Sequence, residues 1–330
     1  MVLRPDAGDV RWGIVGTANI ARAQFLPGLR EAGRGRAVLV GSRDASRAAA
    51  YAGEHGVDRG VAGYAAVVES PDVDAVYVAV PNSQHAEWTI RALQAGKAVL
   101  CEKPLAVGVE ETSRVLRAAA TLPGALLWEA FVFPFQAQHQ RLLAMLADGA
   151  IGEPEEIVSS FHFLVSRPEN IRFSASLGGG CLADVGTYPI RLAQEIFGQD
   201  GAAVAGATAS VAAEVEADAA GLVTWGAGRL LLTCGFRRTY DTFTSVLGPA
   251  GQLQLTNPFH PQPPDTLVLR RPGQDVVTER PTTDAHSFTA ALRHIHAVLH
   301  GEAAPRQLAA ESALTTARVL ADLQTACGLR

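Results

Sequence analysis

The sequence has 330 residues and a formal net charge of −5; hydrophobic residues make up 48% and charged residues 18%. This length suggests about two domains, and the composition supports a sizeable core rather than disorder. The basic residues are scattered, which argues against nucleic-acid binding, and no apolar run reaches the ~20 residues of a membrane span. The polar segment Met1–Trp12 lacks the apolar core of a secretory signal, and the four cysteines form no C-x-x-C pair. We therefore expect a cytoplasmic, reduced, globular protein without a metal site or a disulfide framework.

Strand-like and helical segments alternate over the first 125 or so residues. We expect strands at 10–15, 37–41, 74–80, 97–101 and 125–128, and helices at 20–32, 45–54, 83–95 and 109–120. Pro27 should break or kink the first helix, and Ser83 should cap the helix that ends at Gly96. Such alternation predicts a parallel, doubly wound sheet with right-handed crossovers.

The pattern changes after Phe131. A helix is expected at 137–147, a strand at 155–165, a Gly-rich turn at 178–180 and a helix at 189–197. Several short strands between 202 and 269 suit a mainly antiparallel sheet, and helices at 285–299 and 308–325 close the chain. We therefore predict an α/β protein with a parallel domain at 1–126 and a second α/β domain at 127–330.

A lysine follows one of the buried strands directly. The strand at 97–101 leads into Glu102-Lys103-Pro104. Because all strands of a parallel sheet end at the same edge, and ligands bind in the crevice there, Lys103 lies where chemistry is expected.

The first strand leads into a G-x-A-x-x-A turn, Gly16-Thr17-Ala18-Asn19-Ile20-Ala21. Gly16 permits the tight turn, Ala18 lets the backbone approach a pyrophosphate, and Ala21 allows close packing of helix on strand. Ala18 replaces the usual second glycine of the dinucleotide fingerprint. An ordinary strand-to-helix turn is the alternative interpretation of these residues.

The residues after the second strand indicate the cofactor. Sites specific for NAD place an acidic residue there to bind the ribose 2′-hydroxyl. This chain has Ser42 and Arg43, followed by Asp44 and Arg47, and such side chains can bind a 2′-phosphate. We therefore expect NADP, although Asp44 leaves NAD open and Arg43 could be a solvated surface residue.

Four motifs occur in one order along the chain: residues 16–21; Pro81-Asn82 with His85; Glu102-Lys103-Pro104; and Gly178-Gly179-Gly180 followed by Asp184 and Tyr188. In this combination the chain resembles the glucose–fructose oxidoreductase / inositol dehydrogenase / MocA family over nearly its whole length. The resemblance implies an N-terminal Rossmann domain and a C-terminal α/β domain with a large open sheet that mediates homodimers or homotetramers. It also implies NAD(P)-dependent hydride transfer at a secondary alcohol or ketone of a sugar-like substrate.

The resemblance also implies roles for individual residues. Lys103 is the catalytic lysine, and Asp184 and Tyr188 form the second catalytic pair, with tyrosine where several relatives carry histidine. With the residues argued individually, we expect substrate contacts at Lys103, Arg172, Asp184 and Tyr188. We expect cofactor contacts at Gly16, Thr17, Ala18, Asn19, Ile20, Ser42, Arg43, Arg47, Val80, Pro81, Asn82, His85, Glu102 and Lys103.

The chemistry of Asp184 and Tyr188 agrees with these roles. Their four-residue spacing would place them on one face of a helical turn. Reduction of a ketone requires a proton donor, and a nearby ammonium such as that of Lys103 would lower the tyrosine pKa from its ordinary value of about 10. Asp184 would orient the lysine or bind a second substrate hydroxyl. The alternative is a helix-terminal carboxylate beside a half-buried aromatic ring.

Other candidates are weaker. His294, His296 and His300 lack acidic partners at ligand spacing, so packed or surface histidines are expected. Arg172 could reach the substrate or form a structural salt bridge. His162 and Trp128 are candidates for a pocket wall, and Cys181 is expected to be a small packing residue.

The residues leave the substrate open. The segments around Arg172 and Asp184 are similar to NADP-dependent aldose and dihydrodiol dehydrogenases. Phe131–Phe133, Gln138-His139 and Phe259 are similar to nucleotide-sugar 3-ketoreductases of deoxysugar pathways. A sugar-sensing regulator of the same fold would not need Lys103 and Tyr188, so their presence favours an enzyme.

Overall fold

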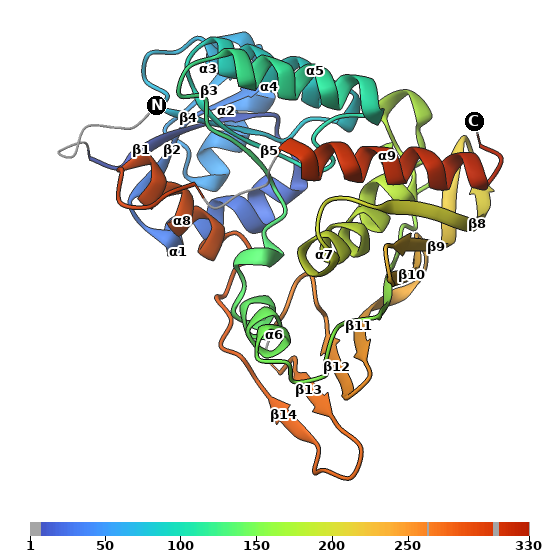
Figure 1. Ribbon diagram of the computed structural model, residues 1–330. Helices are drawn as coiled ribbons and strands as arrows, with labels where there is room; N and C mark the ends of the chain where they lie inside the picture. Colours follow the sequence, from blue (N-terminus) through green and yellow to red (C-terminus); the bar gives the residue numbers. More distant parts are fainter. Residues whose placement is uncertain (1–7, 263, 306–309, 330) are drawn as a thin grey trace. The chain divides into compact units, whose positions relative to one another are not determined.

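The computed structural model describes residues 8–262, 264–305 and 310–329, which form two compact units (Figure 1). Unit 1 contains the described residues of 1–132 and 284–309, and unit 2 those of 133–283 and 310–330. The expected domain boundary at 126/127 stays a prediction. Most of the Met1–Trp12 segment and the expected start of the last helix at 308 lie outside the described residues. No helix in the described ranges combines the length and the apolar character needed to cross a bilayer.

Unit 1 contains the expected parallel sheet. Its strands have the order β3-β2-β1-β4-β5-β6, and every neighbouring pair is parallel. The order reverses between β1 and β4, and in doubly wound sheets ligands bind outside the carboxyl ends of the strands at such a switch point. The strands are β1 (Val10–Val15), β2 (Gly35–Ser42), β3 (Arg59–Ala62), β4 (Ala75–Val78), β5 (Ala98–Cys101) and β6 (Leu127–Glu129).

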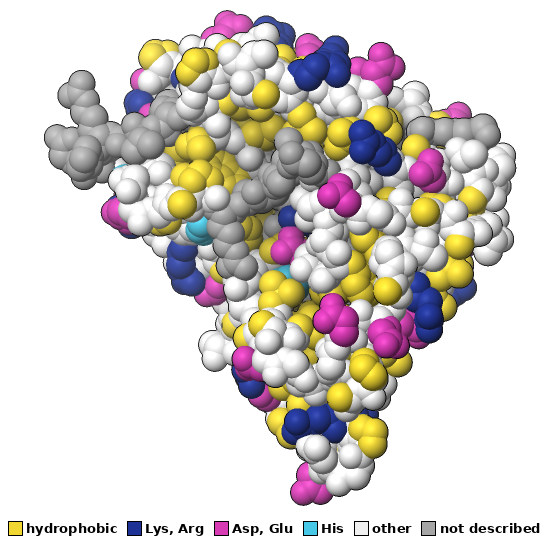
Figure 2. Space-filling model, in the orientation of Figure 1, with side chains coloured by type: hydrophobic (Ala, Val, Ile, Leu, Met, Phe, Trp, Pro, Cys, Tyr) yellow, Lys and Arg dark blue, Asp and Glu magenta, His cyan; other side chains and the backbone are white. Residues whose placement is uncertain are grey.

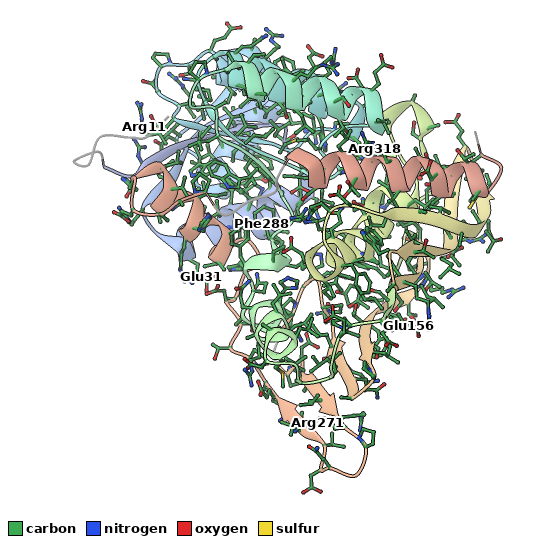
Figure 3. The ribbon with its side chains drawn as sticks, in the orientation of Figure 1. Arg11, Glu31, Glu156, Arg271, Phe288 and Arg318 are labelled. Carbon is green, nitrogen blue, oxygen red and sulfur yellow. The ribbon has the colours of Figure 1, made fainter. Side chains whose placement is uncertain are left out.

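Helices cover both faces of this sheet: in Figure 1, α1 and α8 lie at one face and α3, α4 and α5 at the other. A cluster of aromatic rings packs α1 and α8 onto the strands. Phe25 stacks on Tyr77 with ring centroids 4.0 Å apart, and Phe288 lies edge-on to both. Glu31, labelled with Phe288 in Figure 3, accepts hydrogen bonds from the backbone N–H groups of Ala285 and His286 before α8. The helices are α1 (Leu26–Ala32), α2 (Ala45–His55), α3 (Ala65–Val68), α4 (His85–Gln94), α5 (Gly108–Thr121) and α8 (Thr289–Leu299).

Two local expectations for unit 1 have different outcomes. The break or kink expected at Pro27 stays a prediction: a π-helical turn at Ala21–Phe25 runs directly into α1, which carries the proline in its first turn. The prediction that Ser83 caps α4 is wrong. The Gln84 N–H bonds the Pro81 carbonyl at 2.8 Å, so Ser83 lies within a 3₁₀ turn and α4 begins at His85 without a side-chain cap.

Unit 2 contains an eight-stranded sheet with the order β14-β13-β12-β11-β7-β10-β9-β8. Only β7 and β10 are parallel neighbours among its described strands. The mainly antiparallel sheet is therefore confirmed. The strands are β7 (Glu156–Leu164), β8 (Ala202–Ala212), β9 (Val215–Trp225), β10 (Gly228–Gly235), β11 (Arg237–Gly248), β12 (Gly251–Thr256), β13 (Leu267–Arg270) and β14 (Val277–Glu279).

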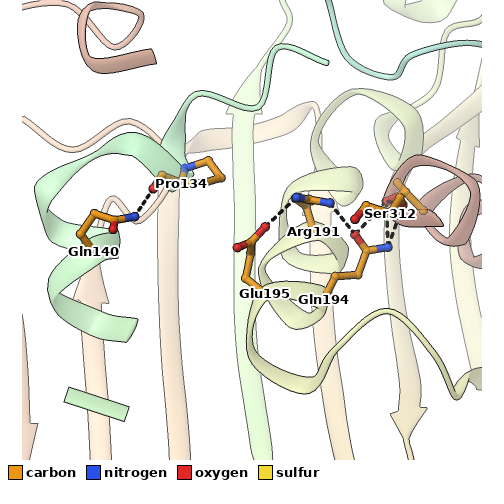
Figure 4. Close-up of polar contacts among 7 residues, drawn as sticks. Pro134, Gln140, Arg191, Gln194, Glu195 and Ser312 are labelled. Atoms are coloured by element: carbon orange, nitrogen blue, oxygen red, sulfur yellow. Dashed lines mark hydrogen bonds and ion pairs between the residues drawn. The ribbon is translucent and has the colours of Figure 1, made fainter. Parts of the chain in front are cut away.

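The helices of unit 2 are α6 (Ala137–Ala147), α7 (Thr187–Phe197) and α9 (Ala310–Ala326). α7 packs on β7 and β10, and α9 packs on α7 and β8. Buried polar groups join α7 to α9: Arg191 bonds Gln194 and Glu195, and the Gln194 amide donates to the Ser312 carbonyl (Figure 4). Ile157 and Phe161 of β7 are buried, whereas Val158 between them is exposed, as expected for a sheet covered on one face.

Candidate functional site

The turn after β1 lies tightly against its neighbours. Gly16 has φ +106°, and a Cβ added there would lie 2.5 Å from the Ala79 carbonyl oxygen that follows β4. Its N–H donates to the Gly41 carbonyl of β2 at 3.1 Å. A side chain at residue 16 would therefore be both strained and obstructed, so the turn requires glycine.

The other residues of the predicted phosphate-binding motif lie between Gly16 and the start of the π-helical turn at Ala21. Ala21 is fully buried, as close helix–strand packing requires, and Asn19 is exposed. The Ala18 carbonyl accepts a hydrogen bond from the Tyr51 hydroxyl of α2 at 3.3 Å, and Ile20 precedes the first π-helical residue. Ala18 itself is half-buried.

Arg47 links the ends of β1 and β2. Its Nε donates to the Thr17 hydroxyl at 2.8 Å. The Asp44 carboxylate instead caps α2, accepting from the Arg47 N–H at 2.7 Å and the Ser46 hydroxyl at 2.6 Å. The Ser46 bond is the main cause that holds the pKa of Asp44 below its ordinary value. Ser42 is buried, and Arg43, Asp44 and Arg47 are all exposed beside it. The Asp44 carboxylate is engaged in the helix cap.

Three side chains hold the segment around Lys103 at the end of β5. The Tyr77 hydroxyl donates to Glu102 at 2.5 Å, the His85 ring contacts the Pro104 carbonyl at 2.7 Å, and the Leu105 N–H donates to Glu129 at 2.8 Å. Burial raises the pKa of Tyr77 well above its ordinary value, so it remains a phenol donor. The Lys103–Pro104 peptide bond is cis, and Lys103 is half-buried.

The sequence interpretation missed Tyr77 and Glu129 as anchors. Glu129 is buried and ends β6. It could have been found from the sequence in the same way as Lys103, because it is a charged residue at the carboxyl end of a strand in a parallel sheet. His85, predicted to contact the cofactor, is 1% exposed, and its second ring nitrogen contacts the Val80 carbonyl at 2.9 Å. Pro81 and Asn82 follow in the 3₁₀ turn and are half-buried.

In unit 2, Arg172 and Asp184 form an ion pair. The Arg172 Nε donates to Asp184 at 2.6 Å, and the guanidinium lies 5.4 Å from the centre of the Phe163 ring. The Arg172 carbonyl accepts from the Gly180 N–H at 2.9 Å, so the glycine turn closes on the same residue. The salt bridge that was one interpretation of Arg172 is present, and contact with substrate stays a prediction.

Gly180 is required by its surroundings. It has φ +114°, and a Cβ there would lie 2.4 Å from the carboxylate of the buried Glu216 of β9. Asp184 follows in a π-helical turn, Leu182–Gly186, and Tyr188 belongs to α7. The expected single α-helical turn across both residues is therefore not formed.

Tyr188 lies in an aromatic cluster and is 5% exposed. Its ring centroid is 5.2 Å from Phe161 and from Phe259, 5.5 Å from His260 and 6.2 Å from Phe133. Phe259 and His260 follow β12 in a loop, and no sequence pattern marked His260 as a neighbour of Tyr188.

Asn257 holds that loop. It adopts φ +47°, accepts hydrogen bonds from Tyr240 (2.7 Å) and Thr242 (3.0 Å), and donates to the His260 carbonyl (2.5 Å) and to Asp265 (3.0 Å). Asparagine tolerates this left-handed conformation better than most residues. The aromatic wall beside Tyr188 is thus fixed by polar contacts on the far side of the loop.

The weaker candidates have structural surroundings. Trp12 donates to Nε2 of His296 at 3.0 Å, and Nδ1 of His296 contacts the Gly33 carbonyl at 2.8 Å. His162 contacts the Thr233 hydroxyl, and Trp128 is buried. The sulfur atoms of Cys181 and Cys234 are 3.7 Å apart. Within the described part of the chain, no three His, Cys, Asp or Glu side chains gather as a metal site would require.

Comparison with known proteins was made at the level of family, sequence and fold. The family described as "Oxidoreductase family, NAD-binding Rossmann fold" matches residues 10–130, and "GFO/IDH/MocA C-terminal domain" matches residues 139–254. The dTDP-3,4-didehydro-2,6-dideoxy-alpha-D-glucose 3-reductase of Actinomadura kijaniata is 34% identical over 317 residues, 93% of this chain and 92% of the relative. The D-xylose 1-dehydrogenase (NADP(+)) 2 of Haloferax volcanii is 30% identical over 76% of this chain and 77% of its own length. Among solved structures, the 3-ketoreductase KijD10 of A. kijaniata, in complex with NADP and TDP-benzene, superposes with a TM-score of 0.86 at 30% identity, covering 96% of this chain and 98% of that chain.

Proposed function

The chain belongs to the Gfo/Idh/MocA oxidoreductase family, and from this premise we propose that it transfers hydride between NADP and a secondary alcohol or ketone of a sugar-like substrate, of the aldose or dihydrodiol dehydrogenase type. The observation that carries the proposal is the position of Lys103. It follows β5 at the carboxyl edge of the parallel sheet, beside the β1–β4 switch point, in a segment anchored by Tyr77, His85 and Glu129. A lysine held this firmly at the ligand-binding edge supports a role in chemistry.

Lys103 would polarise the substrate oxygen with its ammonium group, which stabilises negative charge that develops there during reduction. Tyr188 would exchange the proton of the hydroxyl group, and its hydroxyl would stay oriented because the surrounding rings restrict the side chain. Asp184, paired with Arg172, would bind a substrate hydroxyl as an acceptor. The dinucleotide supplies the hydride when it is bound.

The end of β2 supports NADP over NAD. NAD-specific sites use a carboxylate on the ribose 2′-hydroxyl, but Asp44 accepts two hydrogen bonds as the cap of α2. Ser42, Arg43 and Arg47 offer a hydroxyl group and two guanidinium groups for a 2′-phosphate.

A second candidate is a nucleotide-sugar 3-ketoreductase. The A. kijaniata relative with this printed activity matches over nearly its whole length, and the KijD10 complex holds TDP-benzene. Beside Tyr188 and the fully buried Phe259, the His260 ring is half-buried, and a sugar or base ring could stack on it. The chemistry at Lys103 is the same in both candidates, so they differ in the size of the substrate.

The two candidates are separated by NADPH oxidation with free aldoses, diketones and keto-deoxy nucleotide sugars. If the protein turns over free sugars or diketones at lower substrate concentrations than it needs for nucleotide sugars, the first candidate is supported. If it needs lower concentrations of nucleotide sugars, the second candidate is supported. A sensing regulator would bind NADP tightly and turn over none of them. That third result would contradict the enzymatic proposal.

We also propose a cytoplasmic homodimer or homotetramer formed through the open face of the unit 2 sheet. Leu231 of β10 is in register with Val158 of β7 on one side and with Leu222 of β9 on the other, and all three side chains are exposed. This apolar row supports pairing of two sheets. Light scattering on the wild type and on Leu231→Glu tests it: the variant should have a lower mass, and a monomeric wild type would contradict it.

A further inference from the structure

His85 lies between two backbone carbonyl groups. Nδ1 is 2.7 Å from the Pro104 oxygen and Nε2 is 2.9 Å from the Val80 oxygen, both within hydrogen-bond range, and the side chain is buried. Val80 follows β4 and Pro104 follows Lys103 after β5. The ring therefore joins the two chain segments that leave neighbouring strands at the ligand-binding edge.

The two acceptors distinguish His85 from an ordinary packed histidine. A carbonyl oxygen only accepts, and a neutral imidazole has one donor and one acceptor nitrogen. His296 shows the ordinary case: Trp12 can only donate to its Nε2, so Nδ1 carries the proton toward Gly33 and the neutral ring is fully satisfied. At His85, one N–H satisfies one carbonyl, and only the protonated ring satisfies both.

Opposing effects act on the charge of His85. Burial lowers its pKa, as does the positive charge of Lys103, while the Pro104 and Val80 carbonyls raise it. Together these effects lower the pKa of His85, so the ring is neutral at neutral pH. Only one ring nitrogen then carries a hydrogen, and that N–H donates to one of the two carbonyls. A histidine placed here for packing alone would not need to face two carbonyls.

Resting on the proposed function, we propose that His85 is a positioning residue for Lys103: the buried ring packs between the Pro104 carbonyl and the Val80 carbonyl after β4, donates its N–H to one of them, and so fixes where the lysine leaves the sheet. Tyr77 and Glu129 hold the segment at Glu102 and Leu105, and His85 holds it at the residue directly after the lysine. Loss of this contact would displace the ammonium group without removing it. Small displacements of this kind can cost about 10- to 100-fold in rate.

The test compares His85→Met, which has no donor, with His85→Gln, whose amide can still donate. Met should lower kcat by about 10- to 100-fold, a larger effect than that on the NADP dissociation constant, and Gln should restore most of the rate. Unchanged kcat in the Met variant would overturn the proposal. Equal losses of kcat and NADP affinity in both variants, in step with thermal stability, would overturn it too, because they indicate a structural role only.

A second measurement does not depend on activity. The chain has two lysines, Lys97 and Lys103, so a protein labelled with ¹³C at lysine side chains gives two assignable NMR environments. His85→Met should shift the Lys103 signal and leave that of Lys97, which donates to the Ser70 and Val73 carbonyls. A Lys103 signal unmoved by the substitution would overturn the positioning role. If the wild type turns over no substrate, the proposed function fails, while this spectrum still decides the inference.

Discussion

The carboxyl edge of the unit 1 sheet and the neighbourhood of Tyr188 in unit 2 hold their polar side chains in different ways. Around Lys103 and Gly16 the contacts are made largely to backbone groups: the Gly41 carbonyl, the Pro104 carbonyl and the Leu105 N–H. Around Tyr188 an ion pair and a set of aromatic rings join side chains, and contacts to backbone groups, such as that of Asn257 with the His260 carbonyl, are added to them.

Because of this difference, we expect the two regions to tolerate side-chain substitutions differently. Backbone contacts depend on the path of the chain, so the position of Lys103 is set by the sheet itself. Side-chain contacts can be exchanged one residue at a time, so the Tyr188 region is where relatives could vary their substrate. Basic and acidic side chains are interspersed on the face seen in Figure 2.

The largest effect is expected from Lys103→Met. It should lower kcat by about 10³-fold, because the preorganised charge at the substrate oxygen is lost, while NADP affinity stays within about threefold. Steady-state kinetics and calorimetry measure both. Lys97→Met is the matched control: it removes two hydrogen bonds to carbonyls and should lower stability without a comparable loss of kcat. Turnover of Lys103→Met like that of the wild type would reject the catalytic role.

Tyr188→Phe should lower kcat by about 10²-fold, the lower range for loss of a proton-transfer group. One limb of the pH–rate profile should disappear with the hydroxyl. Tyr240→Phe, which removes a phenol that bonds Asn257, is the control and should keep both limbs. A Tyr188→Phe profile with both limbs intact would move proton transfer elsewhere.

The free energy of unfolding should depend on pH through His296 of unit 1. Burial lowers the pKa of His296 to about 4 from about 6.5 in the unfolded chain. Between these values the unfolded chain binds more protons, so His296 stabilises the fold above pH 6.5 and this contribution is lost as the pH falls toward 4. The loss is on the order of 3 kcal/mol. Urea unfolding followed by tryptophan fluorescence should give a flatter pH curve for His296→Gln; an identical curve would contradict the neutral state.

Arg43→Ala should reduce the preference for NADP over NAD by about tenfold, since a charge-assisted contact with the 2′-phosphate is lost. Dissociation constants for both dinucleotides measure it. Arg36→Ala is the control, because Arg36 lies on β2, the strand that ends just before Arg43, and pairs with Asp58. An unchanged preference in Arg43→Ala would remove the basis for NADP.

The smallest effect is expected for the ion pair of unit 2. A double-mutant cycle of Arg172→Met and Asp184→Asn should give a coupling of about 1 kcal/mol in unfolding free energy, reduced because the Arg172 side chain is 38% exposed. Strictly additive effects would show that the pair contributes nothing to the region.

The sequence predicted the fold well where local patterns decide it. The apolar run Ala75–Val78 forms a fully buried strand, and Ala137–Ala147 is helical, both as expected. The type of helical turn could not be predicted at Asp184, where the chain forms a π-helical turn, or at Ser83, where a 3₁₀ bond to Pro81 forms first. These choices depend on contacts that no local pattern records.

The residues of the candidate site also differ in how far the sequence alone predicts them. Gly16 and Lys103 follow strands, and strand ends can be read from hydrophobicity. Glu129, His260 and the role of Asn257 depend on segments brought together by folding, so their part in the site became visible only in three dimensions.

The central claim is hydride transfer from the dinucleotide to a sugar-like carbonyl carbon. It is tested most directly with NADPH carrying deuterium at the transferable position of nicotinamide C4 and a substrate that the wild type reduces. Mass spectrometry and NMR of the product should find one deuterium on the former carbonyl carbon, and Lys103→Met should form that product far more slowly. Tight NADP binding with no deuterium transferred to any of the free aldoses, diketones or keto-deoxy nucleotide sugars would contradict the account.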